Sequence, residues 1–403
     1  MTSEDQAALD TLLDDDSSAE SERPNLSLYG FADASVERMY STGKGPSLAE
    51  SPVFTVGNVN VYLASNLTHG FSSLIEVRFS YLPNGTAGAS GSYETTSAAD
   101  SANFGRTEQW GGIVLQRVHL DYSFRGWLNV RVGQFLTPYG IWNVDHGSPT
   151  IIGTNKPYVV GDGLFPQRQT GLEVFGSRLF GATTLGYHVT VSNGRSDVLN
   201  SDFDKNKALG GRLFLASDAI GAFKLGVSAY GGRATMQPYS GLDTTSTPPL
   251  PAKLSDNQYD ELALAGDLQW DLGNLHLQGE GILRQVRYLE AGRKTQTDFT
   301  GALTGLVPDN LRWGWYGLAG YRLPWLAAMP FVLVEQNCGI AGSSPTGAFF
   351  DPAGRILTLT GGLNVRPVPS VVLKVQATWI KPPADGPGAG SLTAVSGQAA
   401  WAF

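Results

Sequence analysis

The sequence predicts an all-β fold: a transmembrane antiparallel β-barrel of about 16 strands, with short periplasmic turns and long extracellular loops. Three observations support this fold class: low charge, alternation of apolar and polar residues, and connections that alternate between short and long. Only 16% of the 403 residues are charged, against about 25% in ordinary soluble domains, and 50 are glycine. The longest apolar run, 323–334, contains two prolines and is shorter than the ~20 residues of a membrane-spanning helix.

Apolar and polar residues alternate from Leu26 onward, as they do in strands that turn one face toward an apolar environment. Leu373 and Val375, for example, fall on one face of a strand, and Lys374 and Gln376 on the other. The pattern predicts sixteen strands, at 26–40, 53–66, 71–81, 113–123, 128–134, 169–178, 184–193, 208–216, 223–232, 258–271, 275–288, 312–322, 329–337, 355–366, 371–380 and 392–403. Eighteen or fourteen strands remain possible, because glycine-rich segments such as 338–354 are ambiguous.

The connections between these strands alternate in length. The even-numbered ones have few residues, as at 124–127 and 272–274, whereas the odd-numbered ones are long, as at 82–112 and 135–168. Outer-membrane barrels combine tight periplasmic turns with long extracellular loops. Both chain termini are therefore expected on the periplasmic side. Closure of the sheet satisfies every backbone group in lipid, and sixteen strands leave room for an aqueous channel. Aromatic residues near strand ends suit the interfacial girdles: Tyr122, Trp270, Trp313, Tyr321 and Trp379.

The first 25 residues form a separate acidic extension, so we divide the chain into residues 1–25 and a barrel at 26–403. Eight acidic residues precede Arg23, whereas the rest of the chain is near neutral. We expect a flexible periplasmic tail or a short helix that docks a periplasmic partner. The extension lacks the apolar stretch of a secretory signal, which leaves a protein that is not exported or a mature form; the barrel pattern favours the mature form. No basic stripe suggests nucleic-acid binding, and the lone Cys338 suggests neither a disulfide within the chain nor a zinc site.

The last predicted strand ends in Trp401 and Phe403, which share one face with Val395. This ending resembles the signal read by the barrel-assembly machinery of Gram-negative bacteria. The resemblance implies an outer-membrane, multi-pass protein that is surrounded by outer-membrane lipid.

A second resemblance lies at 132–140, VGQFLTPYG, preceded by an Arg-bearing strand at 117–122. Strand, turn, strand and a G-Q-F-x-T-P-[FY]-G segment are similar to the phosphate-selective porin family within the Gram-negative porin superfamily. The match covers roughly residues 113–175. That family commonly has Lys where this chain has Leu136, and its lysine clusters are missing here. The resemblance therefore implies a porin, without implying a phosphate site.

Residues that alternate with the lipid-facing ones are expected to line the lumen. They are Arg78, Glu76, Arg117, His119, Asp121, Arg131, Glu173, Arg212, Asp267, Glu280, Arg284, Arg322, Glu335, Arg366 and Lys374. They could select ions by charge, or they could form pairs that brace the wall.

The longest connection, 135–168, is the third of the long loops. In sixteen-stranded porins the third loop folds inward, and by that resemblance it narrows the pore here; the alternative is an ordinary extracellular loop. Its candidate constriction residues are Trp142, Asn143, Asp145, His146, Lys156 and Asp162.

Enzyme motifs are missing: the chain has no G-x-S-x-G, H-E-x-x-H or Walker sequence, and its five histidines are scattered. We therefore expect no enzyme and no cofactor. The expected function is passive diffusion of small hydrophilic solutes or ions, with weak selectivity that leans to anions. The alternative is a barrel that sheathes a partner protein such as an electron-conduit cytochrome. A homotrimer is expected by family resemblance, with the small outward residues Gly279, Gly281, Gly317 and Ala319 allowing close packing.

Overall fold

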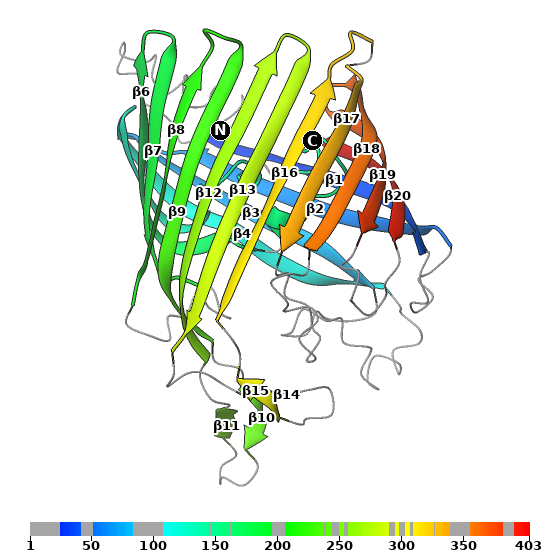
Figure 1. Cartoon of the computed structure of the whole chain (residues 1–403). Coiled ribbons are helices and arrows are strands. Elements are labelled where there is room, and N and C mark those ends of the chain that lie inside the picture. The colour runs from blue at the N-terminus through cyan, green and yellow to red at the C-terminus, as the bar shows by residue number, and fades with distance from the viewer. Residues whose placement is uncertain are drawn as a thin grey trace.

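A computed structural model places sixteen strands in one closed antiparallel barrel (Figure 1). The structure describes residues 25–41, 51–83, 108–144, 147–161, 163–195, 206–236, 239–243, 250–253, 257–289, 295–297, 303–306, 309–325, 327–338, 355–381 and 391–403. The barrel strands are β1 (Asn25–Ser41), β2 (Val53–Asn66), β3 (Phe71–Pro83), β4 (Glu108–Arg125), β5 (Leu128–Leu136), β6 (Arg168–Phe180), β7 (Thr183–Ser192), β8 (Ala208–Ser217), β9 (Ala222–Met236), β12 (Asn257–Leu272), β13 (Leu275–Tyr288), β16 (Asn310–Tyr321), β17 (Met329–Cys338), β18 (Arg355–Val368), β19 (Val371–Lys381) and β20 (Leu392–Ala402).

The predicted sixteen-stranded barrel is confirmed, and each predicted strand overlaps one barrel strand. The largest difference is at β4, which begins at Glu108 rather than at residue 113. Residues 108–112 read Glu-Gln-Trp-Gly-Gly, so the sequence there has no apolar alternation to detect. Two small hairpins lie within connections that we predict as undivided long loops: β10 (Tyr239–Asp243) with β11 (Leu250–Lys253), and β14 (Thr295–Thr297) with β15 (Leu303–Leu306).

Strands β1 and β20 close the barrel by pairing from Phe31 with Ala402 to Ser41 with Leu392. Closure leaves no sheet edge with unpaired backbone groups. The last residue continues this pairing, because the backbone N–H of Phe403 donates to the carbonyl oxygen of Gly30 at 2.9 Å. A Cβ atom at Gly30 would meet the Phe403 ring at 2.8 Å, so glycine is what lets this ring lie over β1.

The two ends of the barrel differ, as the sequence predicts. Consecutive strands meet at one end through short links such as 126–127, 181–182 and 273–274, and at the other through long ones such as 84–107 and 137–167. In the two-residue link between β12 and β13, Gly273 has φ 58°, a left-handed conformation that tight hairpin turns require. Asn25 and Phe403 both lie at the short-link end, and Figure 1 shows both small hairpins beyond the opposite rim.

Burial on the barrel is the reverse of burial in a soluble protein. On β19, Lys374 and Gln376 are buried inside, whereas the alternating Leu373 and Val375 are 45% and 52% exposed on the outer face. The same exchange holds on β17, where Glu335 is buried and Val332 is exposed. An apolar exterior around a polar interior is what a barrel in lipid requires. In the described residues, no helix is long and apolar enough to cross a membrane.

Candidate functional site

The connection between β5 and β6 spans residues 137–167, and we call it the inner loop. Its described residues, 137–144, 147–161 and 163–167, lie inside the barrel. Its apolar side chains pack against an apolar patch on the inner wall from β8 to β17. Tyr139 lies 5.9 Å from Tyr230 between ring centroids, and Trp142 meets Tyr316 edge-on at 6.2 Å. The cluster consists of Tyr139, Trp142, Ile151, Val159, Leu164 and Phe165 from the loop and Ala208, Tyr230, Ala263, Ile282, Tyr316, Leu318, Phe331 and Leu333 from the wall. The described part of this loop therefore packs against the inner wall, unlike an ordinary extracellular loop.

Hydrogen bonds fasten the base of the inner loop. The amide of Asn143 donates to the carbonyl oxygen of Thr137 at 2.7 Å and to that of Gln167 at 2.8 Å. The Thr137 hydroxyl donates to the carbonyl oxygen of Pro166 at 2.5 Å. These bonds join the start of the loop to its end, so the two ends of the loop lie side by side at the wall.

The outgoing half of the loop then contacts β7 and β13. The Tyr139 hydroxyl bonds the Thr190 hydroxyl of β7 at 2.7 Å, and the backbone N–H of Ile141 donates to Glu280 Oε2 of β13 at 3.3 Å. Gly140 between them has φ 70°, and a Cβ there would overlap the Glu280 carboxylate. The approach of the loop to β13 therefore depends on a glycine at this position.

The tip of the loop is held by β18, β19 and β1. Lys374 Nζ donates to the carbonyl oxygens of Ser148 at 2.6 Å and Gly153 at 2.9 Å. Arg366 donates to the carbonyl oxygen of Pro149 at 2.6 Å, and the Ser148 hydroxyl donates to the Asp33 carboxylate. A buried lysine thus has backbone carbonyls of the loop as its main acceptors.

The returning half follows β20 and β17. The backbone N–H of Thr154 donates to Gln376 Oε1 at 2.8 Å, and its hydroxyl bonds the Ser396 hydroxyl at 2.9 Å. A single helical turn, α3 (Tyr158–Gly161), follows, and the Tyr158 N–H donates to Glu335 Oε2 at 2.6 Å. The bonds described here reach β1, β7, β13 and β17–β20, and none of them goes to β2, β3 or β4.

The wall around β2 to β7 carries a network of charged pairs. Arg117 Nε lies 2.6 Å from Glu76 Oε2, and Arg131 bridges Asp121 at 2.8 Å and Glu173 at 3.0 Å. Asn60 and Tyr62 also donate to Glu76, His119 bonds Asp121 at 2.9 Å, and His188 bonds Glu173 at 2.8 Å. Each carboxylate has at least two donors, which is how charges are retained in a partly buried wall.

A second group of pairs lies on β8, β12 and β13. Arg212 lies 2.5 Å from Asp267 and also donates to the carbonyl oxygen of Pro138 in the inner loop. Glu261 receives Arg284 at 2.7 Å and Arg195 at 3.1 Å. Nearer the short links, Arg322 pairs with Asp271 at 2.9 Å.

Among the cations that have no carboxylate at ion-pair distance in the described part of the chain, three form a group: Arg78 of β3, and Lys156 of the inner loop and Arg168 at the start of β6, which both lie within electrostatic range of Arg78. We call them the cation cluster. Arg78 lies within electrostatic range of the other two and of Glu76. Burial and the Arg78 cation together lower the pKa of Lys156 to about 8, against the opposing effect of the Glu76 carboxylate.

The candidate pore-lining residues are placed on the inner side of the wall, where they have two kinds of partner. Arg117, His119, Asp121, Arg131, Glu173, Arg212, Asp267, Arg284 and Arg322 form pairs within the wall. Glu280, Glu335, Arg366 and Lys374 bond the inner loop, while Arg78 belongs to the cation cluster.

Of the candidate constriction residues, Trp142 and Asn143 are buried within the loop and Lys156 belongs to the cation cluster. Asp145, His146 and Asp162 lie outside the described residues. Sequence reasoning missed Arg168, because the predicted strand began at residue 169. It also missed Asp33, because the same face of β1 carries the apolar Phe31. In the described ranges, no group of three His, Cys, Asp or Glu side chains could hold a metal ion.

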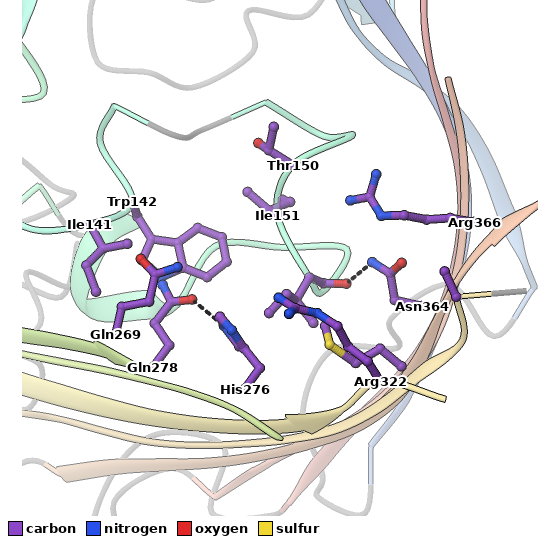
Figure 2. A pocket seen from close by; sticks show the side chains of 13 residues that line it. Ile141, Trp142, Thr150, Ile151, Gln269, His276, Gln278, Arg322, Asn364 and Arg366 are labelled. Atoms are coloured by element: carbon purple, nitrogen blue, oxygen red, sulfur yellow. Dashed lines mark hydrogen bonds between the residues drawn. The ribbon is translucent and has the colours of Figure 1, made fainter. Parts of the chain in front are cut away.

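Two pockets lie beside the inner loop. One, of about 490 Å³, is lined by Lys156 and Tyr158 and by the carboxylates Glu37 and Glu335. The other, of about 260 Å³, lies between residues 141–142 and 150–152 of the loop and the wall from β12 to β18, and Figure 2 shows its lining.

No protein-family model matches the chain, and no curated protein matches it. Solved structures do. An anion-selective porin from Comamonas acidovorans is 11% identical, with a TM-score of 0.57 over 94% of this chain and 100% of that one. The outer membrane channel DcaP of Acinetobacter baumannii is 13% identical, with a TM-score of 0.55 over 95% and 99%. The trimer form of OmpT, an outer membrane protein of Vibrio cholerae, is 8% identical, with a TM-score of 0.52 over 94% and 100%. The chain therefore has the fold of the outer-membrane porins.

Proposed function

We propose that this protein is an outer-membrane channel, without enzymatic activity, for passive diffusion of small hydrophilic solutes or ions. The proposal rests on the position of the inner loop. The loop crosses the lumen of a sixteen-stranded barrel and is hydrogen-bonded to wall strands between β7 and β20 and to β1. A barrel of this size encloses water unless something fills it. The loop narrows that space on one side, and solutes pass along the wall of β2 to β4.

The alternative function, a sheath around a partner protein, is less well supported. A protein threaded through the barrel needs the space that the inner loop occupies. The apolar cluster that seats the loop on β8 to β17 and the Lys374 bonds to its tip both resist its removal.

The cation cluster supports weak anion selectivity. A charge in a narrow passage acts through its position, and Lys156 and Arg168 lie within electrostatic range of Arg78 on β3. The carboxylates Glu37 and Glu335 line the pocket on the other side of Lys156, so the selectivity is expected to be modest. The Comamonas porin is anion-selective by its title, which agrees with this proposal.

We propose no dedicated phosphate site, since the phosphate-selective family commonly has Lys at the position of Leu136. Leu136 is buried, and it pairs with Arg168 across β5 and β6. We place the chain in the Gram-negative porin superfamily, in the outer membrane, with short links toward the periplasm. Assembly then begins with the barrel-assembly machinery reading Trp401 and Phe403.

The partners are also proposals. A homotrimer would use the outer face of β13 and β16, where Gly279 pairs with Gly317 and Leu277 with Ala319. The Vibrio protein has a trimer form by its title. The acidic extension, at residues 1–25, is proposed as a flexible tail or as a docking segment for a periplasmic partner. Cross-linking in native membranes should give a trimer band; a monomer alone would contradict the trimer.

The test of the function is planar-bilayer recording under a potassium chloride gradient. We expect discrete channel steps and a reversal potential of the sign that marks a modest preference for chloride. Added phosphate should block only weakly. A strongly cation-selective reversal potential, or block by micromolar phosphate, would contradict the proposed selectivity, and the absence of channel steps would contradict the channel itself.

A further inference from the structure

The pocket of about 260 Å³ lies between the inner loop and the short-link end of the barrel (Figure 2). Arg322 and Ala327, in the link between β16 and β17, form part of its lining, and so does His276, the second residue of β13. It shares no lining residue with the cation cluster. A solute that has passed the inner loop reaches this pocket before it leaves the barrel.

Both charged side chains that line the pocket are cationic, and the Asp271 carboxylate beside the pocket bonds Arg322 and His276. Arg322 and Arg366 both line it, and none of the lining side chains is a carboxylate. Arg366 uses one nitrogen to hold the carbonyl oxygen of Pro149, and Arg322 uses one nitrogen to bond Asp271. The two guanidinium groups are within electrostatic range of each other, so an anion between them would relieve their repulsion. A guanidinium presents five N–H donors in a planar fork that matches a carboxylate.

Apolar side chains also line the pocket. Trp142, Ile151 and Met329 line it, and each of them is at least nine-tenths buried. Figure 2 shows the Trp142 ring across the pocket from the two arginines. Neighbouring amides are already bonded: Asn364 donates to the carbonyl oxygen of Ile152 at 3.0 Å and Gln278 to the Tyr316 hydroxyl at 3.1 Å. The lining therefore offers charge at one end and an apolar contact at the other.

We propose that this pocket is a binding site for a small monocarboxylate with an aromatic or aliphatic body. The carboxylate lies against Arg322 and Arg366, and the body lies against Trp142, Ile151 and Met329. The volume is just below the ~300–1,000 Å³ of ordinary ligand pockets, which limits the ligand to a small molecule. The inference rests on the proposed channel function, since the solute reaches the pocket through the lumen.

The test is isothermal titration calorimetry of the full-length protein in detergent with benzoate, acetate and benzamide. We expect benzoate to bind more tightly than acetate, which lacks the apolar body, and more tightly than benzamide, which lacks the charge. Arg322→Gln should weaken benzoate binding about tenfold or more, because a hydrogen bond between charged groups is lost. Arg322 does not bond the inner loop, so this variant leaves the loop contacts in place.

Arg366→Gln should weaken binding similarly, although it also releases Pro149. Arg178→Gln is the matched control, because Arg178 lies near the same end of the barrel and does not line the pocket. Equal affinity for benzoate and benzamide, or unchanged benzoate affinity in Arg322→Gln, would overturn the proposal. Channel steps without benzoate binding would refute this site alone, whereas benzoate binding without channel steps would refute the channel alone.

Discussion

At the scale of single residues, the inner wall carries two kinds of cation: those paired with a carboxylate and those that have none at ion-pair distance. Arg117 and Arg131 are each within 3.0 Å of a carboxylate, and such pairs contribute little net charge to the lumen. Lys156 has no carboxylate at that distance among the described residues, and Arg78 is its charged neighbour. Alternation along the strands places most of these side chains on the inner face. It does not say which of them find partners, because partners lie on neighbouring strands.

Lys156→Gln should therefore shift the reversal potential toward that of a non-selective channel, since it removes a cation that has no carboxylate at ion-pair distance among the described residues. The measurement is a bilayer recording under a potassium chloride gradient. Lys381→Gln makes the same change on the outer face of β19 and should leave the reversal potential unchanged. Equal reversal potentials for Lys156→Gln and the parent would contradict this role.

The charge on Lys156 should also make selectivity depend on pH. Its pKa is lowered to about 8 by burial and by Arg78, so Lys156 is mainly cationic at pH 7 and mainly neutral at pH 9. Raising the pH through 8 removes a positive charge, so the preference for anions should fall. Reversal potentials from pH 6.5 to 9.5 would follow this change. The step near pH 8 should be absent in Lys156→Gln, and its persistence there would assign it to another group.

At the scale of elements, the contacts that hold the inner loop to the wall join distant parts of the chain. Thr154 bonds Ser396, which is 242 residues away, and Lys374 bonds Ser148. The sequence predicts the loop's length and, through its resemblance, its inward path. It could not predict these anchors, because neither periodicity nor spacing links residues so far apart. The sequence shows a glycine at 140, but only its position beside the Glu280 carboxylate explains why no side chain fits there.

Lys374→Met should loosen the tip of the inner loop. The substitution leaves two carbonyl oxygens without their donor, and a hydrogen bond to a charged group contributes about 1.5–3 kcal/mol. Hydrogen exchange of peptides covering residues 147–155 should become faster, and the open-channel current should become noisier. Lys381→Met is the control, because Lys381 lies on the outer face at the end of β19. Unchanged exchange in 147–155 would mean that Lys374 does not hold the loop.

At the scale of the whole molecule, apolar residues face outward and polar residues inward, and this is the level at which the sequence was most informative. Strand positions, their even number and the alternation of short and long links are all local patterns, and the barrel confirms them. The β10–β11 hairpin escaped prediction because its region, 239–253, is rich in Pro and Thr and lacks alternation.

Val375→Arg should destabilise the barrel in lipid, because Val375 is 52% exposed at the middle of β19 on the outer face. An arginine at the bilayer midplane costs about 2–4 kcal/mol. Urea titration of folding into lipid vesicles would measure this loss. Val375→Leu keeps the surface apolar and should fold as the parent does. Equal stability of Val375→Arg and Val375→Leu would mean that this face does not meet the hydrocarbon core.

The central claim is that water fills the barrel and that the inner loop narrows the path through it. Single-channel conductance of the parent and of a variant in which residues 141–161 are replaced by a short Gly-Ser linker tests this claim most directly. The wall strands pair with one another independently of the loop, so the variant should still form a barrel. We expect channel steps from both proteins and a conductance several-fold larger in the variant. No steps from either protein, or equal conductance in the two, would contradict it.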